Sequence, residues 1–185
     1  MTDAVVVLDR SVQMPMRDWY LPARQGASLV ARHISSGSSH RLRGIIGFAE
    51  SAAEIHLDEL DEVDFEHVYG TNLMAAIALG QELLDHQPGR LVTFSSFEPS
   101  AHTTADGFSF FSYPPVAASL AATLGQLRSA RGEDILVDAF CFDTIHLDQT
   151  KAVLSAISEN GGRVAYVEAG NCEDTVRVYL ERLWI

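Results

Sequence analysis

Short apolar runs alternate along the chain with longer stretches in which apolar residues recur at helical spacing. The first run, residues 4–8, is rich in valine and ends at the polar residue Asp9, a pattern typical of a strand buried on both faces. Similar runs predict further strands over residues 42–49, 53–57, 90–95, 135–142 and 164–167. Amphipathic stripes predict helices over residues 19–34, 73–84, 116–127, 151–157 and 175–183.

This alternation of strands and helices predicts an α/β fold. We expect a Rossmann-like, doubly wound three-layer sandwich, in which helices cover both faces of a central, mostly parallel sheet through right-handed crossovers. The link at Glu50 and Ser51 is too short for a crossover, so the runs 42–49 and 53–57 predict one antiparallel edge strand. The length of 185 residues fits a single domain over residues 1–185.

Composition narrows the classes of partner. Hydrophobic residues make up 47% and charged residues 21% of the chain, as in a packed globular domain. Acidic residues number 25 against 13 lysines and arginines, and the resulting net charge of -12 disfavours both nucleic acid and anionic membranes as partners. Seven of the acidic residues lie between Glu54 and Glu66, either as a solvated loop face or as a docking patch for a basic partner.

The cysteines and the hydrophobic segments favour the cytoplasm. Cys141 and Cys172 are the two cysteines and form no C-x-x-C motif, so neither a disulfide framework nor a zinc ribbon is indicated. The start of the chain lacks the pattern of a signal peptide, and no apolar run approaches the roughly 20 residues of a membrane-spanning helix. A cytoplasmic location is therefore expected.

Three polar segments occupy the places where sheets of this kind bind ligands, which are the carboxyl ends of the strands. Residues 9–14 (DRSVQM) follow the first predicted strand. Residues 70–72 (GTN) precede the helix at 73–84, and residues 95–99 (SSFEP) follow the strand at 90–95. We expect these three segments to lie together at one edge of the sheet.

The three segments resemble the metal-ion-dependent adhesion site of the von Willebrand factor type A (VWA) family, which combines D-x-S-x-S, a separate threonine and a separate aspartate. The family motif T-D-G-E-P-T-A-H of a bacterial subgroup, associated with MoxR-type ATPases, is similar to SSFEPSAH at residues 95–102. Further similarities extend over essentially the whole chain: GF at 47–48, GTNL at 70–73, YPP at 113–115 and GGRV at 161–164. The resemblance implies a VWA-like fold.

The resemblance also implies a metal site with altered ligands. Asp9, Ser11 and Thr71 match family ligands, whereas Gln13 stands at the second serine and Ser96 at the aspartate. Mg²⁺ prefers small oxygen ligands that include one or two carboxylates, and a single carboxylate remains here. We predict a degenerate site with no tightly bound cofactor and weak Mg²⁺ binding at most, or a hydrogen-bonded cluster in place of any ion. A VWA domain with a still functional Mg²⁺ site is the alternative.

The function implied by the resemblance is a non-enzymatic protein-interaction or adaptor domain, whose partner would be a protein such as a MoxR-type AAA ATPase. Its predicted partner-binding residues lie in the three segments and just beyond them: Asp9, Ser11, Gln13, Met14, Thr71, Asn72, Ser96, Phe97, Glu98 and His102. The neighbouring aromatic loop at residues 108–113 either packs onto the domain or forms an exposed patch for a protein partner.

Two enzyme classes are weaker alternatives. Residues 64–96 and Tyr113 also resemble a short-chain dehydrogenase, but Ala117 replaces its lysine and residues 9–16 lack a glycine-rich turn. A serine hydrolase would need a G-x-S-x-G elbow, which is absent, although His102 and His146 are conceivable bases. No H-x-x-x-H or H-E-x-x-H motif supports a zinc hydrolase. We therefore predict that the chain is not an enzyme.

Overall fold

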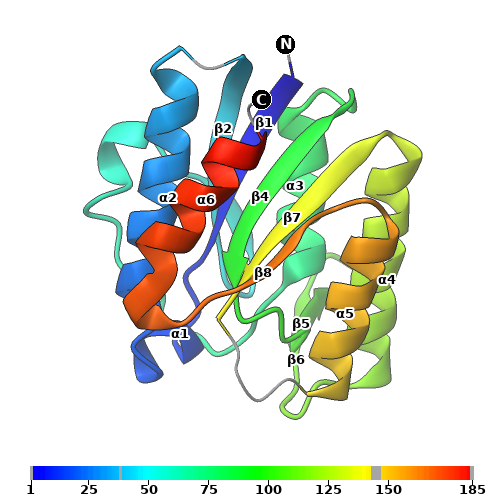
Figure 1. Cartoon of the computed structure of the whole chain (residues 1–185). Helices are drawn as coiled ribbons and strands as arrows, with labels where there is room; N and C mark the ends of the chain where they lie inside the picture. Colours follow the sequence, from blue (N-terminus) through cyan, green and yellow to red (C-terminus); the bar gives the residue numbers. More distant parts are fainter. Residues whose placement is uncertain (1, 38, 143–146, 184–185) are drawn as a thin grey trace.

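A six-stranded sheet forms the centre of the computed structural model, which describes residues 2–37, 39–142 and 147–183 (Figure 1). The strand order is β3-β2-β1-β4-β7-β8, and each neighbouring pair is parallel except β2 and β3. The strands are β1 (Thr2–Asp9), β2 (His40–Phe48), β3 (Ala52–Glu54), β4 (Gly89–Ser95), β7 (Ile135–Cys141) and β8 (Val164–Tyr166). This arrangement confirms the predicted sandwich with one antiparallel edge strand.

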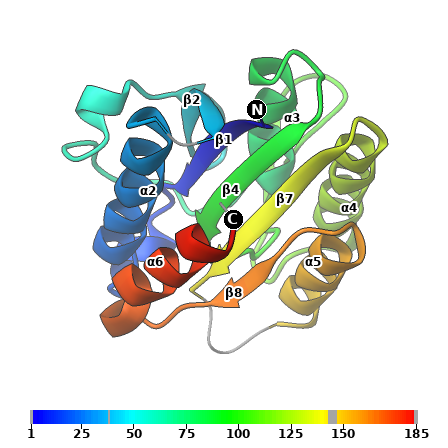
Figure 2. The ribbon, with the colours of Figure 1, turned by 45° about the horizontal axis from the view of Figure 1, so that its top comes forward.

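Helices cover both faces of the sheet (Figure 2). On one face lie α2 (Tyr20–Ser35) and α6 (Cys172–Leu183), and on the other lie α3 (Leu73–Leu83), α4 (Ala117–Gly132) and α5 (Asp148–Glu159). The amphipathic stripes therefore predicted these helices, with shifted boundaries. None of the helices in the described ranges is long and apolar enough to cross a membrane.

Strand β1 shows why the first apolar run is uninterrupted. Val6 and Leu8 pack into the core on the side of α2 and α6, whereas Val5 and Val7 pack into the core on the opposite side. Since successive side chains of a strand point to opposite faces, a central strand between two helical layers needs apolar residues at every position.

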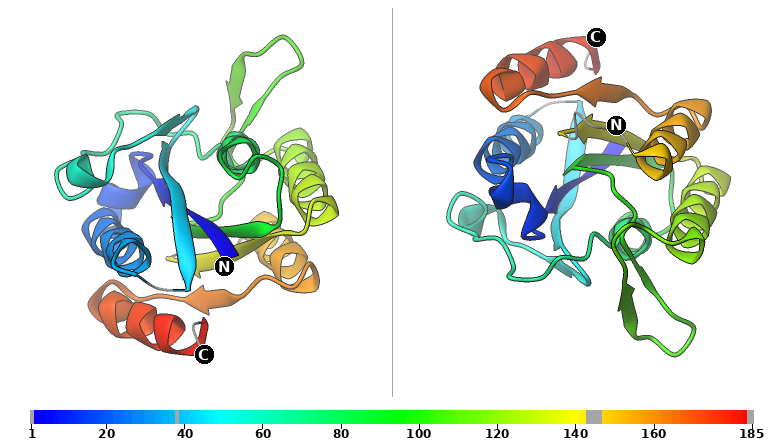
Figure 3. Two further views of the ribbon diagram at one scale, coloured as in Figure 1. Left: turned by 90° about the horizontal axis from the view of Figure 1, so that it is seen from above. Right: turned by 90° about the horizontal axis from the view of Figure 1, so that it is seen from below.

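Two segments differ from their predicted structure. The antiparallel edge strand, predicted over residues 53–57, ends at Glu54, and Leu57–Glu59 form a 3-10 helix, η1. The aromatic loop belongs to a hairpin of β5 (Ala101–Thr103) and β6 (Ser109–Phe111), which projects from the body of the domain (Figure 3). Two further short elements were not predicted: α1 (Gln13–Met16) after β1, and η2 (Ala169–Asn171) before α6.

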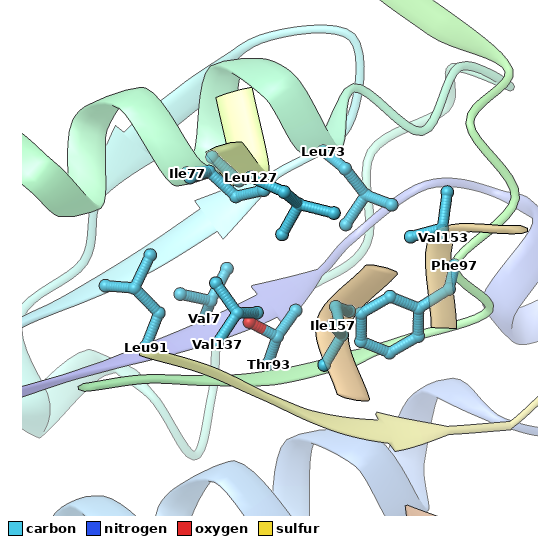
Figure 4. Close-up of a pocket in the computed structure, with 11 residues that line it drawn as sticks. Val7, Leu73, Ile77, Leu91, Thr93, Phe97, Leu127, Val137, Val153 and Ile157 are labelled. Atoms are coloured by element: carbon cyan, nitrogen blue, oxygen red, sulfur yellow. The ribbon is translucent and has the colours of Figure 1, made fainter. Parts of the chain in front are cut away.

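The core between the sheet and helices α3, α4 and α5 encloses a small cavity (Figure 4). Aliphatic side chains such as Val7, Leu91 and Val153 line it, together with the polar residue Thr93. Its volume of about 10 Å³ is at the lower limit for a single water molecule. This cavity is a packing gap in the core, so the residues that carry function have to be sought at the strand ends.

Candidate functional site

Four polar side chains meet at the carboxyl ends of β1 and β4: Asp9, Ser11, Thr71 and Ser95, here called the strand-end cluster. Asp9 Oδ1 accepts a hydrogen bond from the Ser11 N–H at 2.9 Å, and Oδ2 accepts one from the Ser95 hydroxyl at 2.6 Å. The hydroxyl oxygens of Ser11 and Thr71 lie 3.3 Å apart. All four residues have an exposed fraction of 0%. The three segments singled out in the sequence therefore do converge, with Asp9 at their centre.

Asp9 is a buried carboxyl group held by neutral donors. Among the described residues, no lysine, arginine or histidine forms an ion pair with it. Burial raises the pKa of Asp9 from its ordinary 3.8 to about 6, and the hydrogen bonds from Ser95 and Ser11 act in the opposite direction. The carboxyl group therefore holds its proton to a higher pH than an exposed aspartate does, whereas a nearby cation would lower its pKa.

The serine that belongs to the cluster is Ser95, whereas the resemblance to the family motif indicated its neighbour Ser96. The Ser96 hydroxyl oxygen instead accepts a bond from the Glu98 N–H at 3.4 Å. Register explains the difference: Leu8 pairs with Phe94, so Ser95 comes next to Asp9 across the two strands. Successive residues of a strand point in opposite directions, and only one of the two serines can face Asp9.

The turn after β4 has a backbone conformation typical of glycine, although phenylalanine stands where the family motif has glycine. Phe97 adopts φ +58°, the left-handed conformation that glycine reaches most easily and that matches the glycine of the T-D-G-E-P motif. Its N–H donates to the Ser95 hydroxyl oxygen at 3.0 Å, and its ring is 1% exposed within the core. Core packing and this hydrogen bond hold the turn in a conformation that phenylalanine seldom adopts.

The cluster offers a divalent cation one carboxylate, Asp9, together with neutral hydroxyl groups. Both oxygens of Asp9 already accept hydrogen bonds from the protein. The other nearby carboxylate, Glu98, lies with Oε1 3.5 Å from Arg17 Nη1. No group of three or more histidine, cysteine, aspartate or glutamate side chains gathers anywhere in the described part of the chain. A divalent ion would meet one carboxylate and several hydroxyls, the lower end of the one or two carboxylates that Mg²⁺ sites contain.

Most of the predicted partner-binding side chains are buried beneath the loops, which corrects the expectation that they form a contact surface. Met14 and Phe97 belong to the hydrophobic cores, with exposed fractions of 0% and 1%. Asn72 is also buried and caps α3 by accepting a hydrogen bond from the Ala75 N–H at 3.1 Å. These residues stabilise the loops from within. The loops present other side chains to solvent.

Those side chains form a groove of about 560 Å³ beside the cluster. It is lined by Gln13, Met16, Arg17, Tyr69, Phe111 and Tyr113, and is here called the aromatic groove. Tyr69, Phe111 and Tyr113 are 53%, 38% and 55% exposed, so these rings are open to a partner. Sequence patterns did not indicate Met16, Arg17 or Tyr69, because no motif or periodicity distinguishes residues that meet only in the folded chain.

The residues that suggested enzymes lie in different parts of the structure. Ser95 donates its hydroxyl to the carboxyl group of the strand-end cluster. His102 Nδ1 lies 2.9 Å from the Ser119 hydroxyl oxygen. Tyr113, the tyrosine of the dehydrogenase alternative, is exposed on the aromatic groove. His146 lies outside the described residues.

Comparison with known families matches nearly the whole chain to one domain type. Residues 3–180 match the family described as "Rv0959-like protein, vWA domain". No curated protein matches the sequence.

Solved structures give a consistent picture of the fold. The vWF domain of the type V pili tip protein Mfa5 from Porphyromonas gingivalis superposes with a TM-score of 0.75 at 10% identity, over 98% of this chain and 94% of that one. The PilB minor pilin from Streptococcus sanguinis gives 0.66 at 15% identity, over 98% of this chain and 60% of its own. The pilus adhesin SpaC from Lactobacillus rhamnosus GG gives 0.67 at 15% identity, over 98% and 29%. At these identities the likeness is one of fold.

Proposed function

We propose, from the premise that this chain belongs to the Rv0959-like vWA domain family, that it is a non-enzymatic protein-interaction domain that works without a tightly bound metal ion. The observation that carries this proposal is the strand-end cluster. Its loops meet at the strand ends, where Asp9 is closed in by the Ser95 hydroxyl and the Ser11 amide. Binding would then depend on the exposed groove beside the cluster and not on an ion within it.

Calorimetry with Mg²⁺ and Mn²⁺ tests the independence from metal. We expect little heat, because a single carboxylate, already hydrogen-bonded to Ser11 and Ser95, offers weak compensation for a doubly charged ion. Asp9→Ala serves as the matched control, since it removes the single carboxylate of the cluster. A tight site in the wild type that disappears in Asp9→Ala would contradict the proposal and favour a functional Mg²⁺ site.

A double variant tests whether restoring the ligand types of the family motif restores Mg²⁺ binding. Gln13→Ser together with Ser96→Asp restores the two ligand types that the family motif contains. Because the left-handed turn at Phe97 is already present, we expect the double variant to bind Mg²⁺ more tightly than the wild type by calorimetry. An unchanged affinity would mean that the backbone of these loops, and not the side chains alone, has left the metal-binding geometry.

The proposed partner is a protein, and a MoxR-type AAA ATPase in the cytoplasm is the candidate that the subgroup resemblance supports. Binding of a purified MoxR-type ATPase in the presence of EDTA, measured by size-exclusion chromatography, tests this choice directly. Several of the structural neighbours are named as pilus proteins, so fractionation of the native cell is the second measurement. Recovery with the cell envelope would contradict the cytoplasmic assignment without affecting the interaction function.

A further inference from the structure

A second hollow lies at the outer edge of the sheet, between β8 and α6 (Figure 2). Residues 163–165 of the β8 segment and Val178, Tyr179 and Arg182 of α6 line it, and it is here called the edge hollow. Its volume is about 390 Å³, within the range of ligand pockets. The lining of the edge hollow has no residue in common with that of the aromatic groove, so it is a separate surface of the described chain.

The edge hollow combines apolar walls with positive charge. Val164, Ala165 and Val178 supply aliphatic surface, and Val178 is 44% exposed. The charged residues that line the hollow are Arg163 and Arg182, and both are exposed. The hollow therefore offers two guanidinium groups beside an apolar surface.

These two arginines differ from most cations of the chain because no carboxylate accompanies them. Acidic residues outnumber lysines and arginines by 25 to 13, so a cation of this chain readily meets a carboxylate. Nine of the 13 lysines and arginines form ion pairs with described residues. Arg163 and Arg182 belong to the four that form none within the described ranges, and both of them line the edge hollow.

The carboxylate that contacts the lining of the hollow, Asp138, is already compensated. Its Oδ2 lies 2.6 Å from Arg90 Nη1 and accepts a hydrogen bond from the Tyr179 hydroxyl at 2.6 Å. Its Oδ1 accepts a bond from the backbone N–H of Arg163 at 2.8 Å. Because Arg163 uses its backbone in this contact, its guanidinium group has no counter-charge among the described residues.

We propose that the edge hollow binds a short acidic segment of the partner protein. Carboxylates of the segment would pair with Arg163 and Arg182, since a guanidinium fork matches a carboxylate with two parallel hydrogen bonds. Aliphatic side chains next to the carboxylates would cover the apolar walls. A basic segment would leave both arginines uncompensated, and the net charge of -12 opposes long polyanions such as nucleic acid. This inference rests on the proposed interaction function and adds a second contact surface with a stated chemistry.

A titration of the full ¹⁵N-labelled chain with the blocked peptide Ser-Leu-Glu-Glu-Leu-Ser, followed by NMR, tests the inference. We expect shifts of the backbone amides of residues 163–165 and of Val178, and of the Nε–H groups of Arg163 and Arg182. The affinity should fall as salt is added. The same peptide with glutamine in place of glutamate keeps the shape and loses the charge, so it should bind about tenfold more weakly.

Variants separate the edge hollow from a general effect of charge. Arg163→Gln and Arg182→Gln should each weaken the glutamate peptide about fivefold, and the double variant more than either alone. Arg128→Gln is the matched control, because Arg128 is exposed on α4, forms no ion pair with a described residue and does not line the hollow. Its affinity should equal that of the wild type. All three arginines are exposed, so thermal unfolding of the variants should match that of the wild type.

Several results would overturn the inference: no binding of the glutamate peptide, equal affinity for the glutamine peptide, shifts confined to another face, or equal weakening by Arg128→Gln. Inorganic phosphate is the second probe, and tighter binding of phosphate than of the glutamate peptide would assign the hollow to phosphate groups instead.

The proposed function fails separately. If a purified MoxR-type ATPase binds the Arg163→Gln, Arg182→Gln double variant as tightly as the wild type, the domain remains an interaction domain and the edge hollow is not its site. If the ATPase does not bind while the glutamate peptide binds as expected, the choice of partner is wrong and the acidic chemistry of the edge hollow stands.

Discussion

Two aspartates of the sheet are equally buried and differ in what surrounds them. Asp138, in the middle of β7, accepts hydrogen bonds from Arg90 Nη1 at 2.6 Å, from the Tyr179 hydroxyl at 2.6 Å and from the Arg163 N–H at 2.8 Å. Asp9, at the end of β1, accepts bonds from neutral donors of the strand-end cluster. Both have an exposed fraction of 0%.

The difference shows that the properties of a buried carboxyl group depend on the charge of its neighbours as well as on burial. Asp138 is compensated by a guanidinium group, and burial together with the neighbouring carboxylate raises the pKa of Tyr179 well above its ordinary value, which keeps that hydroxyl a donor. Asp138 therefore joins β4, β7 and α6 as part of the fold. Asp9 has no such counter-charge among the described residues, so burial raises its pKa.

Removal of the cation beside Asp138 should have the largest effect. Arg90→Met leaves a buried carboxylate without its counter-charge, and we expect a loss of about 3 to 5 kcal/mol in the free energy of unfolding. Urea denaturation measures it. The matched control is Arg177→Met, which breaks the exposed pair with Glu173 and should cost less than about 1 kcal/mol. Equal losses in the two variants would remove the distinction between the buried pair and a surface pair.

Neutralising Asp9 should raise the free energy of unfolding, the opposite of the change expected for Arg90→Met. The pKa of Asp9 rises from 3.8 to about 6 on folding, so the folded protein binds more protons than the unfolded chain in this interval. The free energy of unfolding therefore falls as the pH rises through this window. Asp9→Asn should flatten the pH dependence and stabilise the protein at pH 7.5 by up to about 3 kcal/mol.

Thermal unfolding between pH 4 and pH 8 measures the effect of Asp9→Asn. Asp138→Asn is its control and should destabilise the protein, because it leaves Arg90 without its carboxylate. An Asp9→Asn variant that is less stable than wild type at pH 7.5 would show that Asp9 is held by more than its neutral donors.

The smallest effect concerns the hydroxyl beside Asp9. Ser95→Ala removes the hydrogen bond that most strongly lowers the pKa of Asp9, so this pKa should move above its wild-type value of about 6, with a loss of about 1 kcal/mol in stability. NMR titration of the Asp9 carboxyl carbon reports the pKa. Ser96→Ala should leave it nearly unchanged, because the Ser96 hydroxyl oxygen contacts the Glu98 N–H. A larger shift in Ser96→Ala would reverse the assignment of the two serines.

The order of the main elements was predictable because burial imposes a repeating pattern. A strand between two helical layers, such as β1, must be apolar at consecutive positions, and a helix on one face must be apolar at every third or fourth. The prediction was wrong where apolar residues are buried for another reason. Ile55 lies in the core with an exposed fraction of 7% although β3 has already ended. The three-residue strands of the β5–β6 hairpin are too short to show a period.

The strand-end cluster was predictable in its loops and only partly in its members. Asp9 and Ser11 stand out as polar residues directly after a buried strand, and Thr71 stands out through its match to the family threonine. The choice between Ser95 and Ser96 depends on the register of β1 against β4, which no local pattern encodes. The same holds for the burial of Met14 and Phe97, which depends on helices and turns far away in sequence.

The sequence by itself determined the layered α/β fold through local composition and spacing, and its motifs carried the resemblance to the VWA family and picked out the three loops that meet at the strand ends. Tertiary structure alone decided that Asp9 is held by hydroxyl and amide donors while Asp138 has an arginine, and that exposed aromatic rings from separate loops form a groove around Gln13. Such contacts join residues distant in the chain, and their energies depend on burial and distance, which exist only after folding.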